Sequence, residues 1–465
     1  MMFKPDTYKK RRDTLRKMLP EGGIVYFPGN TEVPFNYPDN TYKYRQDSTF
    51  IYYFGFQEPG LAAVMDIDEG TECLFGNDST LSDIIWMGKQ PSMSEKAAAI
   101  MVDGTKPCED LTAVLQKAQQ QGRTVHFLPP YRAETKIRLW ELLGIPPNEQ
   151  KEKASEALIK AVVKMRMVKE QQEIEQIETT MDTAWKMHVY AMKYATAGTV
   201  EQRLTGAIEG IASMDGGNIA FPVILTVNGQ ILHNHYHGNT MRDGQLLLLD
   251  TGAENAMRYA TDVTRTIPVS ARFSEQQKAI YNIVLQANLK GIEMSRPGVY
   301  YRDVHLAAAR VIADGLKDAG IMRGNMENAV AQGAHTLFFP HGLGHAMGLD
   351  VHDMENLGEN YVGYDETIAR STEFGLKSLR FGRKLEKDFV LTVEPGIYFI
   401  PALIAQWEAE KKHSEFINYD VLKKYSDFGG IRLEDDILIT DEGSRLMGRP
   451  IPKTVEEIEE YRSQQ

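Results

Sequence analysis

Carboxylates placed beside apolar, strand-like runs are the residues in this sequence best suited to chemistry. Asp250 follows four consecutive leucines, and Asp262 lies in a second strand-like run, Tyr-Ala-Thr-Asp-Val-Thr-Arg-Thr-Ile. We interpret the two runs as a hairpin whose turn is centred on Ala256, which places Asp250 opposite Asp262 with Cβ atoms ~5 Å apart. Two carboxylates that face each other in an apolar setting repel, and burial adds a desolvation cost. A cation is therefore expected between them.

Two alternatives require no metal ion at this hairpin. In the first, Arg265 or Arg258 supplies the positive charge. In the second, the register is shifted and both aspartates are solvated turn residues.

Two further carboxylates end or follow apolar strands. Glu394 follows the run Phe-Val-Leu-Thr-Val and precedes Pro-Gly, which favours exposure of its side chain at a strand end. The alternation of a strand puts Glu434 on the same face as Arg432. An ion pair between these two residues is the alternative to a functional role.

The imidazoles are concentrated in two segments. His233, His235 and His237 lie within five residues, and a Gly-rich segment contains His341, His345 and His352. Its glycines disfavour a regular helix, so the spacing of His341 and His345 does not indicate a helical zinc motif. We interpret the Gly-rich segment as a loop whose backbone comes close to a ligand.

Four carboxylates and one imidazole suit two divalent ions such as Mn²⁺, Co²⁺ or Zn²⁺, with shared carboxylates and a separation of ~3.5 Å. Two such ions can hold hydroxide near neutral pH and polarise a carbonyl group. This chemistry serves the hydrolysis of an amide bond.

The motifs resemble one family in their order and spacing. They are Leu249-Asp250-Thr-Gly, Thr261-Asp262-Val-Thr-Arg265-Thr, His341-Gly-Leu-Gly-His345, Thr392-Val-Glu394-Pro-Gly and Arg432-Leu-Glu434-Asp. Together they resemble the pita-bread metallopeptidases, which include methionine aminopeptidase, prolidase and aminopeptidase P. The resemblance implies two divalent ions per chain, with Mn²⁺ expected. Its implied ligands are Asp250, Asp262, His345, Glu394 and Glu434, of which Asp262 and Glu434 contact both ions.

The same resemblance implies roles for residues around the ligands. Glu394 would also shuttle protons, and His341 and His352 would line the substrate pocket and stabilise the tetrahedral intermediate. His233 fits the family's Ile-Leu-His pattern and joins them in the pocket, and Arg432 would orient neighbouring acids by charge-assisted hydrogen bonds. The extra His235 and His237 depart from the pattern, and residues 356–381 and 402–429 look like insertions.

The first part of the chain resembles the accessory domain of aminopeptidase P through Tyr44-Arg-Gln-Asp-Ser-Thr-Phe50, Tyr53-Phe-Gly-Phe and Ile85-Trp86-Met-Gly. This favours a Xaa-Pro aminopeptidase, acting on peptides with proline at the second position, with prolidase as the alternative. Trp86 would give the peptide an aromatic surface, or else be a buried core residue. Relatives of this type are dimers or tetramers, so we expect a homodimer or homotetramer.

The pattern of strands and helices along the chain, together with the resemblance, predicts two domains and an α+β fold. We expect residues 1–160 to form a smaller α/β domain with a mixed sheet, and residues 161–465 to form the pita-bread catalytic domain. The strands expected in the first domain are Gly23–Phe27, Phe50–Phe56, Leu61–Asp66 and Glu72–Phe75. The helices expected there are Leu111–Gln119 and Ala133–Leu143. Helices are also expected within 154–195, 200–214 and 274–320, with strands at 219–227 and 245–269.

Composition excludes several classes of function. The formal charge of −12, from 52 basic and 64 acidic residues, argues against a nucleic-acid partner. No apolar run approaches the ~20 residues of a membrane span, and two cysteines suit a reducing compartment, so a cytoplasmic protein is expected. A non-catalytic pita-bread peptide binder is a further alternative, but here all five ligand positions hold coordinating residues.

Overall fold

The computed structural model describes residues 2–463 and divides into two compact units. Unit 1 runs to Met165 and also contains Asn356–Tyr361, whereas unit 2 comprises Arg166–Glu355 and resumes at Val362. Among the described residues, no helix combines the length and the apolar character needed to cross a membrane.

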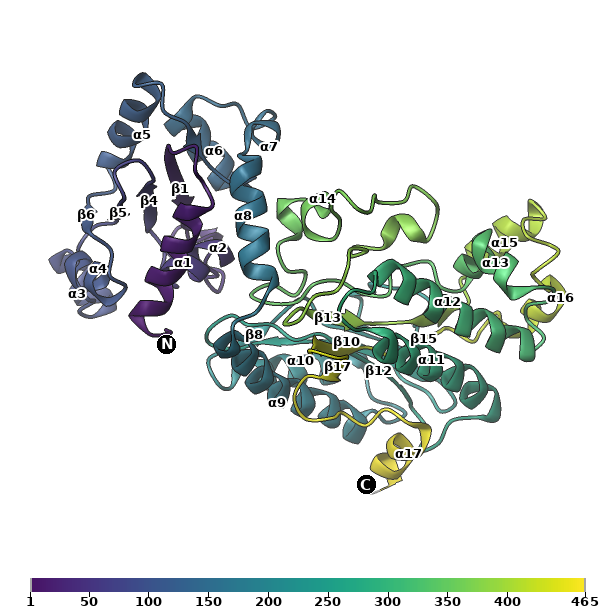
Figure 1. The fold of residues 1–465 in the computed structure, drawn as a ribbon. Helices are drawn as coiled ribbons and strands as arrows, with labels where there is room; N and C mark the ends of the chain where they lie inside the picture. The colour runs from purple at the N-terminus through teal and green to yellow at the C-terminus, as the bar shows by residue number, and fades with distance from the viewer. Residues whose placement is uncertain (1, 464–465) are drawn as a thin grey trace. The chain divides into compact units, whose positions relative to one another are not determined.

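Unit 1 is built on a five-stranded mixed sheet with the strand order β6-β5-β4-β1-β7 (Figure 1). Strand β1 pairs antiparallel with β4 and parallel with β7, which confirms the predicted mixed sheet. The elements are α1 (Pro5–Lys17), β1 (Ile24–Pro28), β2 (Pro34–Tyr37), β3 (Asn40–Thr41), α2 (Ser48–Phe54), β4 (Ala62–Asp66), β5 (Thr71–Phe75), α3 (Leu81–Met87), α4 (Met93–Ala99), β6 (Gly104–Lys106), α5 (Asp110–Gln120), β7 (Val125–His126), α6 (Ala133–Leu143), α7 (Gln150–Lys153) and α8 (Glu156–Met167).

The strand predicted at Phe50–Phe56 is wrong, because this aromatic run lies largely in helix α2. The Asp47 side chain caps the helix by accepting a hydrogen bond from the backbone N–H of Phe50 at 2.9 Å. Gly55 ends it with φ 75°, a conformation that glycine adopts without strain. Every residue of α2 is buried, so no polar face marks it as a helix in the sequence.

Unit 2 consists of several small sheets packed with long helices, with the strand orders β12-β10-β9, β13-β16-β17, β14-β15 and β11-β8. The elements that follow α8 are α9 (Gln171–Tyr194), α10 (Glu201–Ser213), β8 (Asn218–Ile219), β9 (Ile224–Thr226), β10 (Leu246–Thr251), β11 (Ala253–Glu254), β12 (Val263–Pro268), α11 (Glu275–Met294), α12 (Tyr301–Asp318), α13 (Met326–Ala331), η1 (Ala334–Leu337), η2 (Glu355–Leu357), α14 (Glu359–Val362), η3 (Leu376–Ser378), β13 (Val390–Val393), β14 (Gly396–Tyr398), α15 (Pro401–Ala409), α16 (Tyr419–Leu422), η4 (Lys423–Tyr425), β15 (Gly430–Arg432), β16 (Asp435–Ile439), β17 (Ser444–Leu446) and α17 (Val455–Ser463). All of these belong to unit 2 except most of η2 and α14, which lie in the segment of unit 1 at Asn356–Tyr361.

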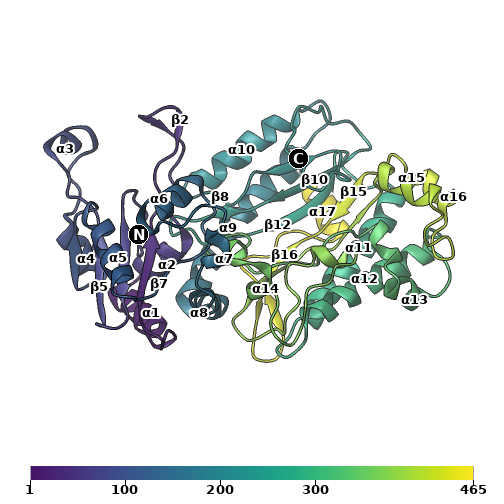
Figure 2. The ribbon, with the colours of Figure 1, turned by 90° about the horizontal axis from the view of Figure 1, so that it is seen from above.

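Helices α9 and α11 support the strands that matter for function. Helix α9 contacts β10 and β12, and α11 contacts β13 and β15. Figure 1 shows α11 beside α12, and Figure 2 shows the same pair seen from above. The strands β10, β12 and β13 are buried along their whole length, so their side chains are held by packing on both faces.

The hairpin formed by β10 and β12 has a register two residues away from the predicted one. Asp250 pairs with Thr264, and Asp262 lies just before the first residue of β12. The turn is centred on Met257 instead of Ala256, and Arg258 adopts a left-handed φ of 72° within it. Because side chains alternate along a strand, a shift of two residues keeps the two aspartates on the same face.

Candidate metal centre

The five predicted ligands come from five separate segments of unit 2 and meet at one cavity of about 370 Å³. Asp250 lies in β10, and Asp262 directly precedes β12. His345 lies in the loop after η1, Glu394 directly follows β13, and Glu434 lies between β15 and β16. The strands thus deliver four carboxylates to one place, and the Gly-rich loop delivers the imidazole.

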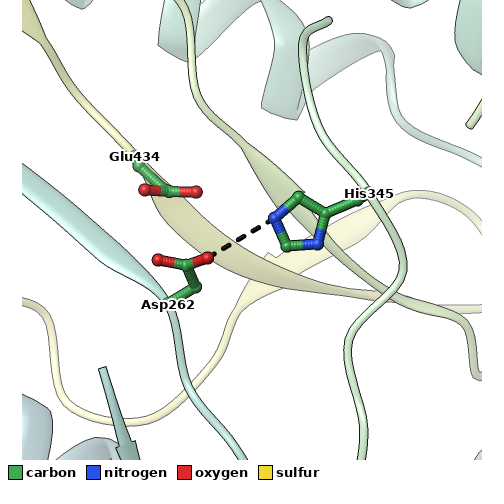
Figure 3. A group of neighbouring side chains, drawn as sticks. All are labelled: Asp262, His345 and Glu434. Atoms are coloured by element: carbon green, nitrogen blue, oxygen red, sulfur yellow. Dashed lines mark ion pairs between the residues drawn. The ribbon is translucent and has the colours of Figure 1, made fainter. Parts of the chain in front are cut away.

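Three of these side chains, Asp262, His345 and Glu434, form the tightest group (Figure 3). One potential ligand atom from each lies within 4.8 Å of the others. Nε2 of His345 lies 3.4 Å from Oδ2 of Asp262. Nδ1 of His345 is 3.2 Å from the Ala346 carbonyl oxygen. A carbonyl only accepts, so the hydrogen belongs on Nδ1 and Nε2 keeps its lone pair toward the carboxylates.

Asp250 and Glu394 complete the cluster from two other sides. Oδ2 of Asp250 accepts a hydrogen bond from Nη2 of Arg432 at 2.6 Å. Oε1 of Glu394 lies 3.7 Å from Nε2 of His345, and its Oε2 lies 3.7 Å from Nδ1 of His341. The Glu394 side chain is 19% exposed, so it is the ligand candidate with the most open approach from the cavity.

The predicted alternative in which Arg265 or Arg258 neutralises the hairpin aspartates does not hold. Arg265 pairs with Asp435 at 2.7 Å, and Arg258 pairs with Glu254 at 2.7 Å. Both aspartates of the hairpin are buried, which rules out solvated turn residues. Arg432 pairs with Asp250 on β10, in place of the intrastrand pair that its spacing from Glu434 allowed.

The electrostatics of the cluster favour a bound cation. Burial, reinforced by the charge of Asp250, raises the pKa of Asp262, and burial together with Asp262 raises the pKa of Glu434. Burial raises the pKa of Glu394 to about 7. Oδ1 of Asp250 and Oδ1 of Asp262 are buried and meet no hydrogen-bond partner among residues 2–463. Carboxylate and imidazole donors with such open lone pairs fit hard or borderline divalent ions.

His341 lies in the cavity wall with both ring nitrogens bonded. Its Nδ1 donates to the carbonyl oxygen of Gly342 at 2.8 Å, and its Nε2 lies 2.8 Å from the Tyr398 hydroxyl. Nη1 of Arg432 donates to that same hydroxyl oxygen at 2.8 Å, so the hydroxyl hydrogen is directed to His341. Burial and the nearby Arg432 lower the pKa of His341 to about 3, which keeps the imidazole neutral.

His352 and His233 also line the cavity. The ring of His352 stacks on His345 with centroids 3.7 Å apart and planes 13° apart, and its Nδ1 lies 2.8 Å from Oε1 of Glu355. Of the extra histidines, His235 lines the cavity as well. His237 does not, since its Nδ1 donates to the Leu225 carbonyl oxygen at 3.0 Å.

Trp86 lies in α3 of unit 1 and is 82% exposed. The alternative of a buried core tryptophan is therefore wrong. Its neighbours Ile85 and Met87 are 70% and 75% exposed, so the helix presents an apolar surface.

The glycines Gly342 and Gly344 of the histidine loop line the cavity, as the predicted approach to a ligand requires, and they also allow close packing. A Cβ on Gly344 would lie 2.1 Å from the carbonyl oxygen of Thr392 in β13, and one on Gly342 would lie 2.7 Å from Cα of Leu379. The absence of a side chain at Gly344 lets the loop pack directly against β13, and its absence at Gly342 lets the loop pack against Leu379. This packing brings His345 beside Glu394.

The sequence did not indicate two residues at this site. Tyr398 in β14 bonds two residues of the cavity wall, His341 and Arg432, and its position four residues after Glu394 was its one signal in the sequence. Arg380 lines the cavity near Glu355, 3.3 Å from its carboxylate, and lies in a segment that we interpreted as an insertion.

Comparisons with known proteins match both units. The model of metallopeptidase family M24 matches residues 175–441, and the N-terminal domain of aminopeptidase P matches residues 8–126. The chain is 32% identical to a Xaa-Pro dipeptidase of Homo sapiens over 94% of its length and 88% of the relative. It is 30% identical to a probable Xaa-Pro aminopeptidase of Verticillium alfalfae over 98% of its length and 96% of that relative.

Solved structures give the same picture of the fold. Pseudomonas aeruginosa aminopeptidase PepP aligns with a TM-score of 0.81 and 26% identity, covering 100% of this chain and 99% of that chain. Aminopeptidase P from E. coli with the inhibitor Pro-Leu aligns with a TM-score of 0.80 and 28% identity over the same shares.

Proposed function

This chain belongs to metallopeptidase family M24, and on that premise we propose that it is a Xaa-Pro aminopeptidase. The reaction is hydrolysis of the peptide bond between an N-terminal residue and a following proline. The observation that carries the proposal is the convergence of four buried or half-buried carboxylates and His345 on one cavity. The relatives whose names specify Xaa-Pro peptides cover nearly the whole chain.

Asp250, Asp262, His345, Glu394 and Glu434 would hold two divalent ions, and Mn²⁺ is the expected metal. Such ions lower the pKa of water and polarise a carbonyl group. Thr264 donates from Oγ1 to Oε2 of Glu434 at 2.6 Å, and Arg432 holds one oxygen of Asp250. These hydrogen bonds fix which oxygen of each carboxylate faces the cavity.

The residues of the cavity have separate roles in proton transfer and in binding the substrate. Glu394, the most exposed of the carboxylates, accepts a proton from the attacking water and delivers it to the leaving proline nitrogen. His341, His352 and His233 line the space for the substrate, and His341 and His352 stabilise the tetrahedral intermediate. The apolar residues Phe221, Pro222 and Ile224 line the same cavity and suit an uncharged ring such as proline.

The length of the substrate distinguishes an aminopeptidase from a dipeptidase. Unit 1 matches the aminopeptidase P N-terminal domain, but the dipeptidase relative covers 94% of this chain as well, so substrate length must be measured directly. The exposed Trp86 is available to a continuing peptide chain, and we propose that it reaches the active site of another subunit in a homodimer or homotetramer. A cytoplasmic location remains the prediction from composition.

A second candidate is the Xaa-Pro dipeptidase, and Arg380 is the observation that favours it. A dipeptidase must recognise the free carboxylate that follows proline, and an arginine in the cavity wall supplies a matching cation. The Arg380 side chain is 45% exposed and is held by Glu355, so it faces both cavity and solvent. The Homo sapiens relative carries the name of this activity.

The deciding experiment compares Ala-Pro, Ala-Pro-Ala and a longer Ala-Pro peptide with Mn²⁺-loaded protein. The aminopeptidase predicts a higher kcat/KM for the two longer peptides and little change in the Arg380→Ala variant. Arg302→Ala is a matched control, since its side chain is similarly exposed at 46% and pairs with Asp303. A preference of tenfold for the dipeptide that Arg380→Ala removes would replace the aminopeptidase with the dipeptidase. No cleavage of any of the three peptides would refute both.

A further inference from the structure

The loop from Ala346 to Asp353 joins the metal-ligand candidate His345 to His352 and folds back on itself. The backbone N–H of Asp353 donates to the Ala346 carbonyl oxygen at 2.9 Å, and the N–H of Gly348 donates to the Asp350 carbonyl oxygen at 3.2 Å. The N–H of Met347 donates to Val390 in β13 at 3.0 Å. This closed loop lets the two imidazole rings stack although they are seven residues apart.

A buried group of charges lies under the end of this loop, next to His352. Oδ1 of Asp353 accepts from Nη2 of Arg166 at 2.7 Å, and Oδ2 accepts from Nζ of Lys169 at 3.1 Å. The side chains of all three residues are at most 3% exposed. We call Asp353, Arg166 and Lys169 the buried clamp. Arg166 also reaches Asp350 in the loop at 3.1 Å.

The clamp has little freedom to move. Lys169 is fixed at both ends, because its Nζ donates to the Arg166 carbonyl at 2.6 Å and its backbone N–H donates to the Asp388 carbonyl at 2.9 Å. A Cβ on Gly348 would lie 2.4 Å from Oδ2 of Asp353, so the loop closes tightly over the carboxylate. Both carboxylate oxygens therefore have set directions.

We propose that Asp353, held by Arg166 and Lys169, is a positioning residue that keeps the ring of His352 stacked on His345 and facing the substrate. The inference rests on the proposed function, in which His352 stabilises the tetrahedral intermediate. A buried ion pair by itself adds little stability over a packed apolar contact, because desolvation offsets the attraction. Its directional hydrogen bonds do fix the carboxylate adjacent to His352, and small displacements of such groups reduce rates strongly.

The test is a double-mutant cycle with Asp353→Asn and His352→Ala, measured as kcat/KM on the best Xaa-Pro peptide below the unfolding temperature of every variant. Asp353→Asn is expected to lower kcat/KM by roughly 10- to 100-fold. In the His352→Ala background it should cause no further loss, since its effect passes through His352. Bound Mn²⁺ should be unchanged, and a crystal structure should show the His352 ring displaced from His345.

Arg462→Gln is the matched control for lost stability. Arg462 is another buried arginine of unit 2, 5% exposed, and donates to the carbonyl oxygens of Met192, Ala195 and Val269, away from the cavity. It should lower the unfolding temperature and leave kcat/KM unchanged. If Asp353→Asn does not fold, Lys169→Met keeps the pair of Arg166 with Asp353 and should show the same coupling with a smaller loss.

Two results would overturn the clamp's role. In the first, the kcat/KM of the double variant falls by the product of the losses seen in the two single variants. In the second, the structure of Asp353→Asn or Lys169→Met still shows the rings of His345 and His352 stacked as before. A wild-type protein that cleaves no Xaa-Pro peptide would defeat the proposed function instead, and the crystal structures would still decide whether the clamp positions His352.

Discussion

Arg432 in β15 and Asp250 in β10 lie on strands of two different sheets, and the guanidinium of Arg432 holds one carboxylate oxygen of Asp250 at 2.6 Å. The same guanidinium donates to the Tyr398 hydroxyl at 2.8 Å, which in turn bonds His341. One planar side chain therefore fixes a ligand candidate and a residue of the substrate pocket together. The other oxygen of Asp250 is left with no hydrogen-bond partner among the described residues and is available to a cation.

Arg432→Lys is expected to weaken both metal binding and turnover although the charge is retained. A lysine ammonium cannot reproduce the planar fork that contacts Asp250 and Tyr398 together. We expect kcat to fall roughly tenfold or more, in line with the loss of a charge-assisted hydrogen bond. Calorimetric titration with Mn²⁺ and steady-state kinetics measure the two effects. Unchanged metal affinity and kcat would separate Arg432 from the centre.

The second prediction concerns metal content. Protein loaded with Mn²⁺ should contain about two ions per chain by elemental analysis, because the carboxylates repel each other without cations. Chelation should abolish hydrolysis and lower the unfolding temperature, since an ion that binds only the folded state stabilises it. Full activity in chelator, with no metal in the protein, would refute the metal mechanism.

Glu394→Gln should keep the shape of the side chain and remove its proton transfer. The expected fall in kcat is at least ~10², typical of lost general acid-base assistance. Asp262→Asn should instead act mainly through lower metal occupancy, because Asp262 lies in the tightest ligand group. Metal content and kcat measured on both variants separate these effects, and near-normal turnover in both would contradict the assignment.

We expect the protein to lose stability in mild acid, because the histidines His188, His305 and His335 are buried. Burial lowers the pKa of His188 to about 3, of His305 to about 3 and of His335 to about 4. The unfolded chain takes up protons near pH 6.5 whereas the folded chain does not, so stability is complete above pH 6.5 and falls below it. Below pH 6.5, each of these histidines lowers the free energy of unfolding by up to about 1.4 kcal/mol per pH unit. Urea unfolding between pH 5 and 8 measures how the free energy of unfolding changes with pH. His305→Leu should reduce this slope, and an identical slope in that variant would count against this account.

Trp86→Ala should impair cleavage of long Xaa-Pro peptides more than that of dipeptides. The physical reason is loss of an exposed aromatic surface against which a continuing chain packs. Trp140→Ala is the control, since Trp140 is also exposed, at 54%, but lies in α6. Kinetics should be combined with light scattering, because we expect the effect to follow oligomerisation. Equal losses on all peptide lengths would argue against this role.

The sequence predicted the composition of the centre better than its local geometry. Carboxylates beside apolar runs are local signals, and the order of the motifs, through the family resemblance, selected the four carboxylates and His345 that line one cavity. The register of Asp250 was not readable, since it depends on a left-handed Arg258 that carries no sequence signature. Arg380 was missed because only tertiary folding brings its segment to the cavity.

The separation of the ligands along the chain bears on how the protein folds. Arg432 and Asp250 are 182 residues apart, and Thr264 and Glu434 are 170 apart. Contacts of such separation form late, because the entropy of closing long loops must first be overcome. A partly folded chain therefore presents isolated carboxylates of weak, unselective affinity. Metal capture becomes a kinetic marker of completed folding, and the rate at which refolding protein takes up Mn²⁺ should follow its slowest structural phase.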